Sequence, residues 1–244
     1  MSLLVAVAVG LGIGATAYFA TRKSSVEKPN LPVLASVCGA AMTLFVVTFA
    51  FLAVSASQAL ASARKDTFAE AGALRELYWV TTAMPDQERD WTQSRIRGYA
   101  EEVVTGEWPA MARGETSRHA QEVLDELRVH LGQAVRDDPV ARGEALSRIH
   151  DVYTARRARI SNIGVGIPPI MLGALVASAA VALGCVLLIG FPPSWRNIVA
   201  LGLLAGEIAF GLYLIVQLNH PFGGDVHIGP DAFQQALDRF RARV

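Results

Sequence analysis

Charged side chains are scarce in this 244-residue sequence and are missing altogether from three long stretches. Only 18% of the residues are charged, and the 22 basic and 22 acidic side chains cancel, so the chain lacks the excess of positive charge typical of nucleic-acid-binding proteins. No Asp, Glu, Lys or Arg occurs in residues 1–21, 29–63 or 160–195. Because a helix of roughly 20 apolar residues spans a bilayer, each stretch is long enough to cross one. An ordinary soluble enzyme is therefore excluded.

The sequence also has few cysteines and lacks the motifs typical of metal sites and catalytic sites. Its two cysteines, Cys38 and Cys185, each lie inside an apolar stretch, where we expect them to pack as small hydrophobic side chains and not as a disulfide framework. The five histidines form no HExxH motif and no Cys/His cluster. A phosphate-binding loop, a dinucleotide-binding glycine motif and a nucleophile elbow are also missing. We therefore predict no metal, no cofactor and no enzyme activity.

The apolar stretches predict four transmembrane helices. The first, residues 3–20, follows no basic residue, which favours a retained span over a secretory signal. The second runs from about residue 31 to 56 and continues a little beyond the bilayer. The third covers residues 170–189, and the fourth covers residues 197–218.

The region between the second and third spans, residues 64–160, reads as helical throughout. A first segment ends at Met84-Pro85, and Asp86 can cap the helix that follows, which we expect to stop near Gly106. Thr116 or Ser117 can cap a third helix, and Asp138-Pro139 opens a last long one. No alternating pattern of useful length predicts a strand, so this insert is expected to be all-α.

The predicted fold is an all-α integral membrane protein, with four transmembrane helices and a helical cytosolic insert between the second and third spans. Its parts are a first transmembrane hairpin (1–63), the cytosolic domain (64–160), a second transmembrane hairpin (161–219) and a C-terminal tail (220–244). In the tail, Phe233, Leu237 and Phe240 recur at helical spacing, which predicts a short amphipathic helix.

Basic side chains near the spans predict the orientation. Arg64-Lys65 follow the second span, Arg156-Arg157 and Arg159 precede the third, and three arginines end the chain. They outnumber the three basic residues between the first two spans, so the positive-inside rule puts the insert and the C-terminus in the cytoplasm. We expect a multi-pass protein of the inner (plasma) membrane, with the lipid bilayer as its surroundings.

The second span has two distinct faces. Ser36, Thr43 and Ser57 repeat at multiples of seven residues and form a polar stripe, which indicates contact with protein or water. An apolar stripe of Phe45, Phe49 and Leu52 lies roughly opposite. Either face is a candidate pore lining: the polar stripe as a wet surface, or the apolar stripe as a constriction that gates by dewetting. A third possibility is that the apolar stripe only contacts lipid or neighbouring helices and lines no pore.

Glu207 is the one charged side chain deep inside a predicted span. An acid in hydrocarbon is costly unless it is neutral, paired or wetted. Two roles are open for Glu207: an ion- or proton-interacting site on a pathway, or a hydrogen bond that fixes helix packing, for example with Thr43 or Tyr213.

Several residues together resemble a known family. An arginine-rich stretch and a proline at a membrane entry follow a set of acidic, aromatic and apolar residues: Glu70, Tyr99, Val103-Val104 and Glu107-Trp108. The string from Leu218 to Gly224, with Pro221, Phe222 and Gly224 as its most specific part, follows the last span. This pattern resembles the bestrophin-like domain of unknown function, a family of mostly bacterial four-span membrane proteins. Asn219-His220 stand where family members commonly have an acid, and the acidic calcium clasp of bestrophins has no convincing match.

The resemblance implies a homo-oligomeric ion channel. Bestrophins are pentameric anion channels whose second span lines the pore with phenylalanines, so by analogy Phe45 and Phe49, with Leu52, form the neck. The partners expected are lipid, inorganic ions and further copies of the chain, with no nucleic acid. The alternative is a non-conducting scaffold or regulatory subunit that binds a partner through its cytosolic helices. Trp79, Trp91, Tyr99 and Trp108 are its candidate anchors, because aromatic residues are enriched at interfaces.

Overall fold

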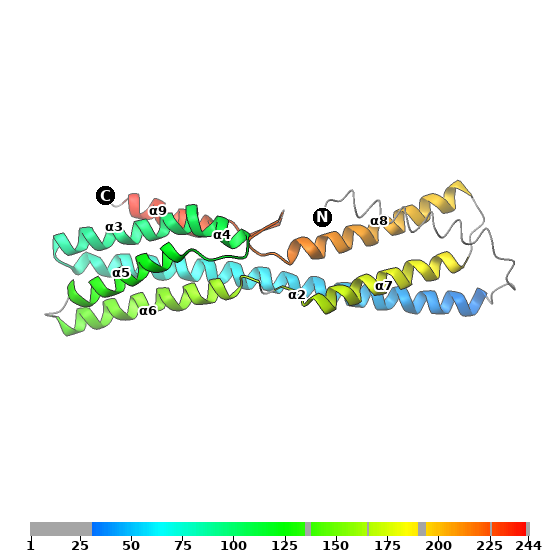
Figure 1. Ribbon diagram of the computed structural model, residues 1–244, viewed down its shortest axis with the longest axis horizontal. Coiled ribbons are helices and arrows are strands. Elements are labelled where there is room, and N and C mark those ends of the chain that lie inside the picture. Colours follow the sequence, from blue (N-terminus) through cyan, green and yellow to red (C-terminus); the bar gives the residue numbers. More distant parts are fainter. Residues whose placement is uncertain (1–30, 135–137, 165, 190–193, 225, 243–244) are drawn as a thin grey trace. The chain divides into compact units, whose positions relative to one another are not determined.

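A computed structural model describes residues 31–134, 138–164, 166–189, 194–224 and 226–242. The chain is helical, and no strand occurs within these ranges (Figure 1). Three helices are long and apolar enough to cross a membrane: α2 (Leu31–Val80), α7 (Pro169–Leu188) and α8 (Trp195–Leu218). The all-α prediction is confirmed, and α7 and α8 match the expected third and fourth spans closely. The predicted first span, residues 3–20, lies outside the described residues.

The second predicted span is part of a single helix of 50 residues. The sequence suggested a transmembrane helix that ends a little beyond residue 56 and a separate helical segment that ends at Met84-Pro85, because charged residues start at Arg64. A helix does not need to end where composition changes, and no proline occurs between Pro32 and Pro85 to interrupt its backbone hydrogen bonds. The division into two helices was therefore wrong.

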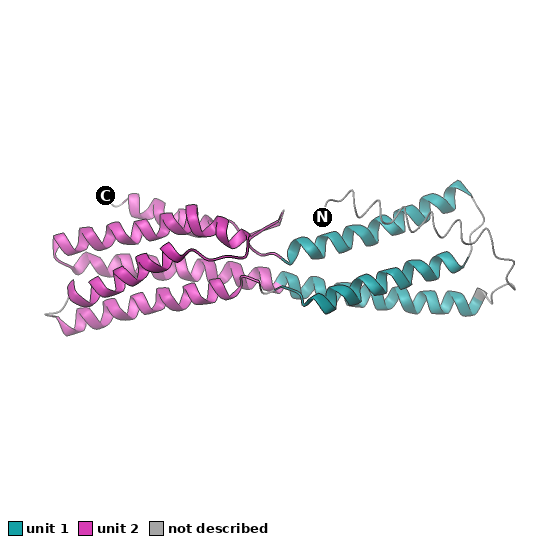
Figure 2. Cartoon of the chain, viewed as in Figure 1, with its two compact units in different colours: residues 1–57, 166–219 teal, residues 58–165, 220–244 magenta. Residues whose placement is uncertain are grey.

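The chain forms two compact units (Figure 2). Unit 1 comprises residues 1–57 and 166–219, and unit 2 comprises residues 58–165 and 220–244. Helix α2 contributes its first part to unit 1 and its second part to unit 2. The C-terminal tail belongs to the same unit as the region between the second and third spans.

Unit 2 is a helical bundle whose helix ends follow local sequence signals. It contains the end of α2, α3 (Asp86–Glu102), α4 (Trp108–Ala112), α5 (Arg118–Ala134), α6 (Pro139–Ser161) and α9 (Asp231–Arg241). Ser117 caps α5 by accepting the Ala120 N–H at 3.2 Å, and the Asp138 carboxylate caps α6 by accepting two backbone N–H groups. Phe233, Leu237 and Phe240 of α9 are buried, as the amphipathic pattern predicted.

Helix α3 does not stop near Gly106, as the sequence suggested. A π-turn (Val103–Glu107) continues it directly into α4, and the Trp108 N–H donates to the carbonyl of Val103. Pro109 lies in the first turn of α4, where a missing N–H costs nothing. Single π-turns of this kind often occur at functional positions, and this one carries the buried side chain of Glu107.

Candidate functional site

The apolar stripe of α2 lies in the core of unit 1. Phe45 is 8% exposed and Leu52 is 2% exposed, and the half-buried Phe49 packs against the same core. The other buried members of this core come from α7 and α8: Leu175, Ala179, Ala182, Leu183, Ile208 and Ile215. A Cβ atom added at Gly211 of α8 would lie 3.0 Å from the Phe49 ring, so the two helices approach closely there. The residues expected to form a pore neck thus have packing partners in their own chain.

The polar stripe of α2 is exposed. Ser36, Thr43 and Ser57 all present their side chains at the surface of the chain. The Ser36 and Thr43 hydroxyls donate to backbone carbonyls one turn earlier, at 3.0 and 2.9 Å. Such bonds satisfy the hydroxyl hydrogen within the helix and leave oxygen lone pairs facing outward. This face can accept hydrogen bonds from water or coordinate a cation weakly.

Glu207 is also exposed and lies outside the core of unit 1. Its neighbours on α8 include Leu203 and Phe210, which are 71% and 56% exposed. Thr43, one partner suggested for Glu207, instead donates its hydroxyl hydrogen to the Gly39 carbonyl. The acid therefore sits on an otherwise apolar surface of α8.

The string after the last span forms a tight turn in unit 2. Pro221 and Phe222 are buried, and the Phe222 ring meets Trp108 edge-on with centroids 5.6 Å apart. Gly224 has φ +86°, a left-handed conformation that favours glycine. At Gly223, an added Cβ would lie 3.0 Å from the carbonyl oxygen of Ala112. The residues of this turn thus allow it to pack closely against α4.

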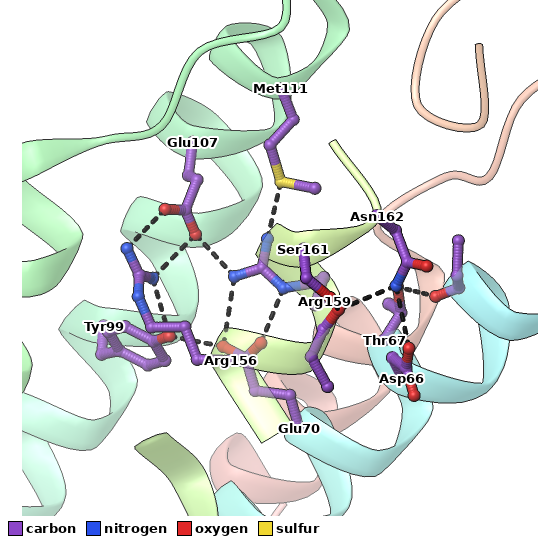
Figure 3. A network of polar contacts seen from close by, with 12 residues as sticks. Asp66, Thr67, Glu70, Tyr99, Glu107, Met111, Arg156, Arg159, Ser161 and Asn162 are labelled. Carbon is purple, nitrogen blue, oxygen red and sulfur yellow. Dashed lines mark hydrogen bonds and ion pairs between the residues drawn. The ribbon is translucent and has the colours of Figure 1, made fainter. Parts of the chain in front are cut away.

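Four charged side chains and one tyrosine form a buried polar network in unit 2 (Figure 3). Arg159 Nε lies 2.6 Å from Glu70 Oε2, and Arg159 Nη2 lies 2.5 Å from Glu107 Oε2. Arg156 binds Glu107 with both terminal nitrogens, at 2.8 and 2.6 Å. The Tyr99 hydroxyl donates to Glu70 and accepts from Arg156 Nη1 at 3.0 Å. The network therefore connects α2, α3, the π-turn and α6.

The network is electrically balanced, with two arginines and two glutamates. Burial raises the pKa of Tyr99 well above its ordinary value, and the Glu70 carboxylate adds to the rise. Burial alone would lower the pKa of Arg159, but Glu70 and Glu107 outweigh it and the pKa is raised. At neutral pH Tyr99 therefore stays a neutral phenol and Arg159 stays charged. Such a cluster holds the helices in one arrangement.

Two aromatic rings pack against the Arg159 guanidinium of the network. The Arg159 guanidinium carbon lies 5.6 Å from the Trp108 ring centroid and 5.5 Å from that of Phe233. Arg159 Nη1 also contacts Met111 Sδ at 2.6 Å. Since Trp108 packs on Phe222 and donates its indole N–H to the Ile228 carbonyl at 3.0 Å, the charged network and the turn after the last span form one continuous structure.

Sequence reasoning noted Glu70, Tyr99 and Glu107 in the family pattern but treated Arg156 and Arg159 only as markers of orientation. The spacing of buried positions along α6 and α2 was a signal that Arg156, Arg159 and Glu70 belong together. On α6 the two arginines continue a buried stripe with alternating spacings of four and three: Ala145, Ile149, Val152, Arg156, Arg159. On α2 Glu70 lies in the stripe Ala63, Thr67, Glu70, Leu74, Leu77. Charges at core positions of several helices need one another as partners.

Two of the proposed partner-binding anchors are ruled out by burial. Tyr99 is fully buried in the network and Trp108 is 6% exposed, so neither reaches a partner protein. Trp91 stacks on His130 with ring centroids 3.7 Å apart. Trp79 is 56% exposed.

Both cysteines are free thiols, Cys38 of α2 buried and Cys185 of α7 half-buried. Among the described residues, no group of three or more His, Cys, Asp or Glu side chains is placed to hold a metal ion.

Comparison with known proteins identifies the family. Residues 3–233 match the Bestrophin-like domain, so the chain belongs to the Bestrophin-like family, as its motifs suggested. The fold is similar to that of a bacterial bestrophin homolog from Klebsiella pneumoniae, whose crystal structure was determined for a point mutant. The two structures have a TM-score of 0.66 and 13% sequence identity, and the match covers 99% of this chain and 97% of that chain. No curated protein matches the sequence. Family membership and three apolar helices together mark this chain as a membrane protein.

Proposed function

We propose that this protein is a homo-oligomeric ion channel of the bestrophin type, with the second span lining its pore. Membership of the Bestrophin-like family and the fold shared with a bestrophin homolog support this proposal. In the same proposal the chain crosses the inner membrane four times, through residues 3–20, the first part of α2, α7 and α8. Unit 2 then lies in the cytoplasm, with the pentamer of bestrophins as the expected assembly.

The observation that carries the proposal is the division of α2 into a packed face and an exposed face. Phe45 and Leu52 are buried against α7 and α8, so a pore beside α2 is bounded by the opposite face. That face carries Ser36, Thr43 and Ser57, whose oxygens can replace part of an ion's hydration. A pore of this kind forms between copies of the chain, each contributing α2, and not within one copy. We therefore favour the polar stripe as the lining over Phe45, Phe49 and Leu52.

Unit 2 supplies the second part of the proposal, a stiff support for α2. Glu70 lies on the same continuous helix as Thr43 and is held by Arg159 and Tyr99. A helix that is fixed by a buried ion network at one end keeps one orientation about its own axis. This orientation decides which side chains of α2 face a central pore.

Reconstitution tests the proposal directly. Purified full-length protein is placed in liposomes loaded with a halide- or cation-sensitive dye, and its subunit number is measured by native mass spectrometry. We expect an oligomer and ion flux that protein-free liposomes lack. A single-copy protein, or an oligomer without flux of any ion, contradicts the channel and supports the non-conducting scaffold. In the scaffold, the exposed Trp79 and the half-buried Trp91 are the remaining candidate anchors.

A further inference from the structure

The carboxyl group of Glu207 has no partner in the part of the chain that the structure describes. Glu207 lies near the middle of α8, 12 residues after Trp195 and 11 residues before Leu218. Its side chain is exposed, and no hydrogen bond or ion pair joins it to another described residue. An acid in the middle of a transmembrane helix is costly unless a partner, water or an ion satisfies it. Its position on α8 shows which of these it can meet.

The packing of α8 against α2 fixes the direction in which Glu207 points. Gly211 of α8 faces α2, because a Cβ atom added there would lie 3.0 Å from the Phe49 ring. Successive residues of a helix are about 100° apart, so Glu207 lies about 40° around α8 from Gly211. Ile208, which is buried, lies about 60° from Gly211 in the other direction. Glu207 is therefore at the exposed edge of the face that packs against α2.

The polar stripe of α2 lies on the same side of the α2–α8 pair as Glu207. The two helices run in the same direction (Figure 1). Seen from their N-termini, Thr43 lies about 120° clockwise from Phe49, and Glu207 lies about 40° anticlockwise from Gly211. For two helices that run in the same direction and face each other, these opposite rotations lead to the same side.

The core of unit 1 supports this assignment. Phe45 lies about 40° anticlockwise from Phe49, and Ile208 lies about 60° clockwise from Gly211, so both are on the other side of the pair. Both residues belong to the buried core that α7 completes. Helix α7 therefore covers one side of the α2–α8 pair, and the polar stripe and Glu207 share the opposite side.

Glu207 and Thr43 also lie at a similar depth. Glu207 is four residues before Gly211, and Thr43 is six residues before Phe49. These steps correspond to about 6 and 9 Å along the two helices, a difference smaller than one helical turn. The Thr43 hydroxyl donates to the Gly39 carbonyl at 2.9 Å, which leaves its oxygen lone pairs available. A carboxylate and a hydroxyl oxygen are thus on one side of unit 1 at one depth.

We infer that Glu207 and Thr43 form a binding site for a monovalent cation beside the proposed pore, and that Glu207 makes this pore prefer cations to anions. The transport part of this inference rests on the proposed channel function. Rings of acidic side chains select cations in channels, and binding there must be weak enough to release the ion. One carboxylate and one hydroxyl from each copy suit a weakly held alkali ion. The analogy with bestrophins predicts an anion channel, and the acid predicts the opposite preference.

Planar-bilayer recordings under a KCl gradient test the ion preference. We expect the reversal potential of the wild type to lie near that of K⁺. In Glu207→Gln the K⁺/Cl⁻ permeability ratio should fall by about tenfold, because the fixed charge is lost at constant size. Glu207→Asp should keep the cation preference. The control is Glu76→Gln, which removes an exposed acid of α2 in unit 2. An anion-selective wild type, or equal ratios in Glu207→Gln and Glu76→Gln, overturns the inference.

A binding measurement separates a failed site from a failed channel. The line width of the sodium NMR signal, recorded with the purified full-length protein in detergent, reports brief binding of Na⁺ and does not depend on conduction. We expect Glu207→Gln and Thr43→Val to reduce the excess line width and Glu76→Gln to reduce it less. Equal line widths for the wild type and Glu207→Gln overturn the cation site. If the line width falls as expected but the wild type carries no current, the site stands and the channel function fails.

Discussion

Arg159 and Glu70 form an ion pair in which both side chains are completely buried, with Arg159 Nε 2.6 Å from Glu70 Oε2. The pair joins α6 to α2 inside unit 2. Removing two charges from water is costly, and only close, multiple hydrogen bonds offset that cost. Here Glu107 accepts a further hydrogen bond from Arg159, and the Tyr99 hydroxyl donates one to Glu70. The arrangement of unit 2 accordingly depends on specific polar contacts as well as on apolar packing.

Replacing Arg159 by methionine should destabilise unit 2 strongly. The apolar volume is similar, but Glu70 and Glu107 lose a buried partner, which costs roughly 3–5 kcal/mol. The matched control is Arg157→Met, because Arg157 is an exposed neighbour on the same helix and its loss should change stability by less than about 0.5 kcal/mol. Thermal unfolding in detergent, followed by circular dichroism, measures both. Equal melting temperatures for the two variants would show that the network contributes nothing.

Stability should fall with rising pH through Tyr99. Burial, with the Glu70 carboxylate, raises the pKa of Tyr99 above its ordinary value near 10. Above pH 10 the unfolded chain loses a phenol proton that the folded chain keeps, so the stabilisation is complete below pH 10 and decreases above it. Unfolding free energies of the wild type should fall more steeply there than those of Tyr99→Phe. At neutral pH, Tyr99→Phe should cost about 1–2 kcal/mol through its lost hydrogen bonds.

An ultraviolet titration supplies a second readout for Tyr99. The phenolate absorbance of the folded wild type should show at least two tyrosines fewer titrating near pH 10 than the unfolded chain, because burial and the hydrogen bond to Asp125 also raise the pKa of Tyr153. The difference should shrink by one tyrosine in Tyr99→Phe. A Tyr99 that titrates normally in the folded protein contradicts the buried hydrogen bond to Glu70.

Phe45→Ala distinguishes a packed side chain from a pore constriction. As a core residue, Phe45 leaves a cavity when truncated, and the lost contacts should cost about 3–5 kcal/mol without raising ion leak. Val37→Ala is the control, because Val37 is 52% exposed and lies on neither the buried stripe nor the polar stripe of α2. Melting temperature and dye flux are measured on the same preparations. An undiminished melting temperature together with a large leak would favour the aromatic stripe as the pore neck.

Glu207→Gln should leave the fold intact and change transport. The side chain is exposed and outside the core of unit 1, so melting temperature and subunit number should match the wild type. In the first of the two roles open for Glu207, a site on an ion pathway, removal of the acid should shift the reversal potential under a salt gradient. A loss of the oligomer with unchanged ion preference would instead make Glu207 a contact between copies.

Much of the fold could be predicted from the sequence, because span length and helix caps are local signals. The limits of α7, the Asp138 cap and the buried face of α9 all follow from residues close in the chain. The continuity of α2 was missed because composition changes near Arg64 while the backbone has no reason to break. The joining of α3 to α4 was missed because a π-turn leaves no strong sequence signature before Trp108.

The polar network could not be predicted in the same way. Arg159 and Glu70 lie far apart in the sequence, and a basic cluster beside a span looks the same whether it faces lipid headgroups or a core. Their position in buried stripes was a usable signal, but choosing partners needs the packing of several helices.

The central claim is that the polar face of α2 lines an ion pore, and planar-bilayer recording of two isosteric variants tests it most directly. Thr43 and Thr48 both donate their hydroxyls to a carbonyl one turn earlier, but Thr43 is on the exposed stripe and Thr48 is half-buried on another side of α2. We predict channel currents from the purified wild type, an altered single-channel conductance in Thr43→Val and an unchanged one in Thr48→Val. Absence of current from the wild type, or equal effects of the two variants, would contradict the claim.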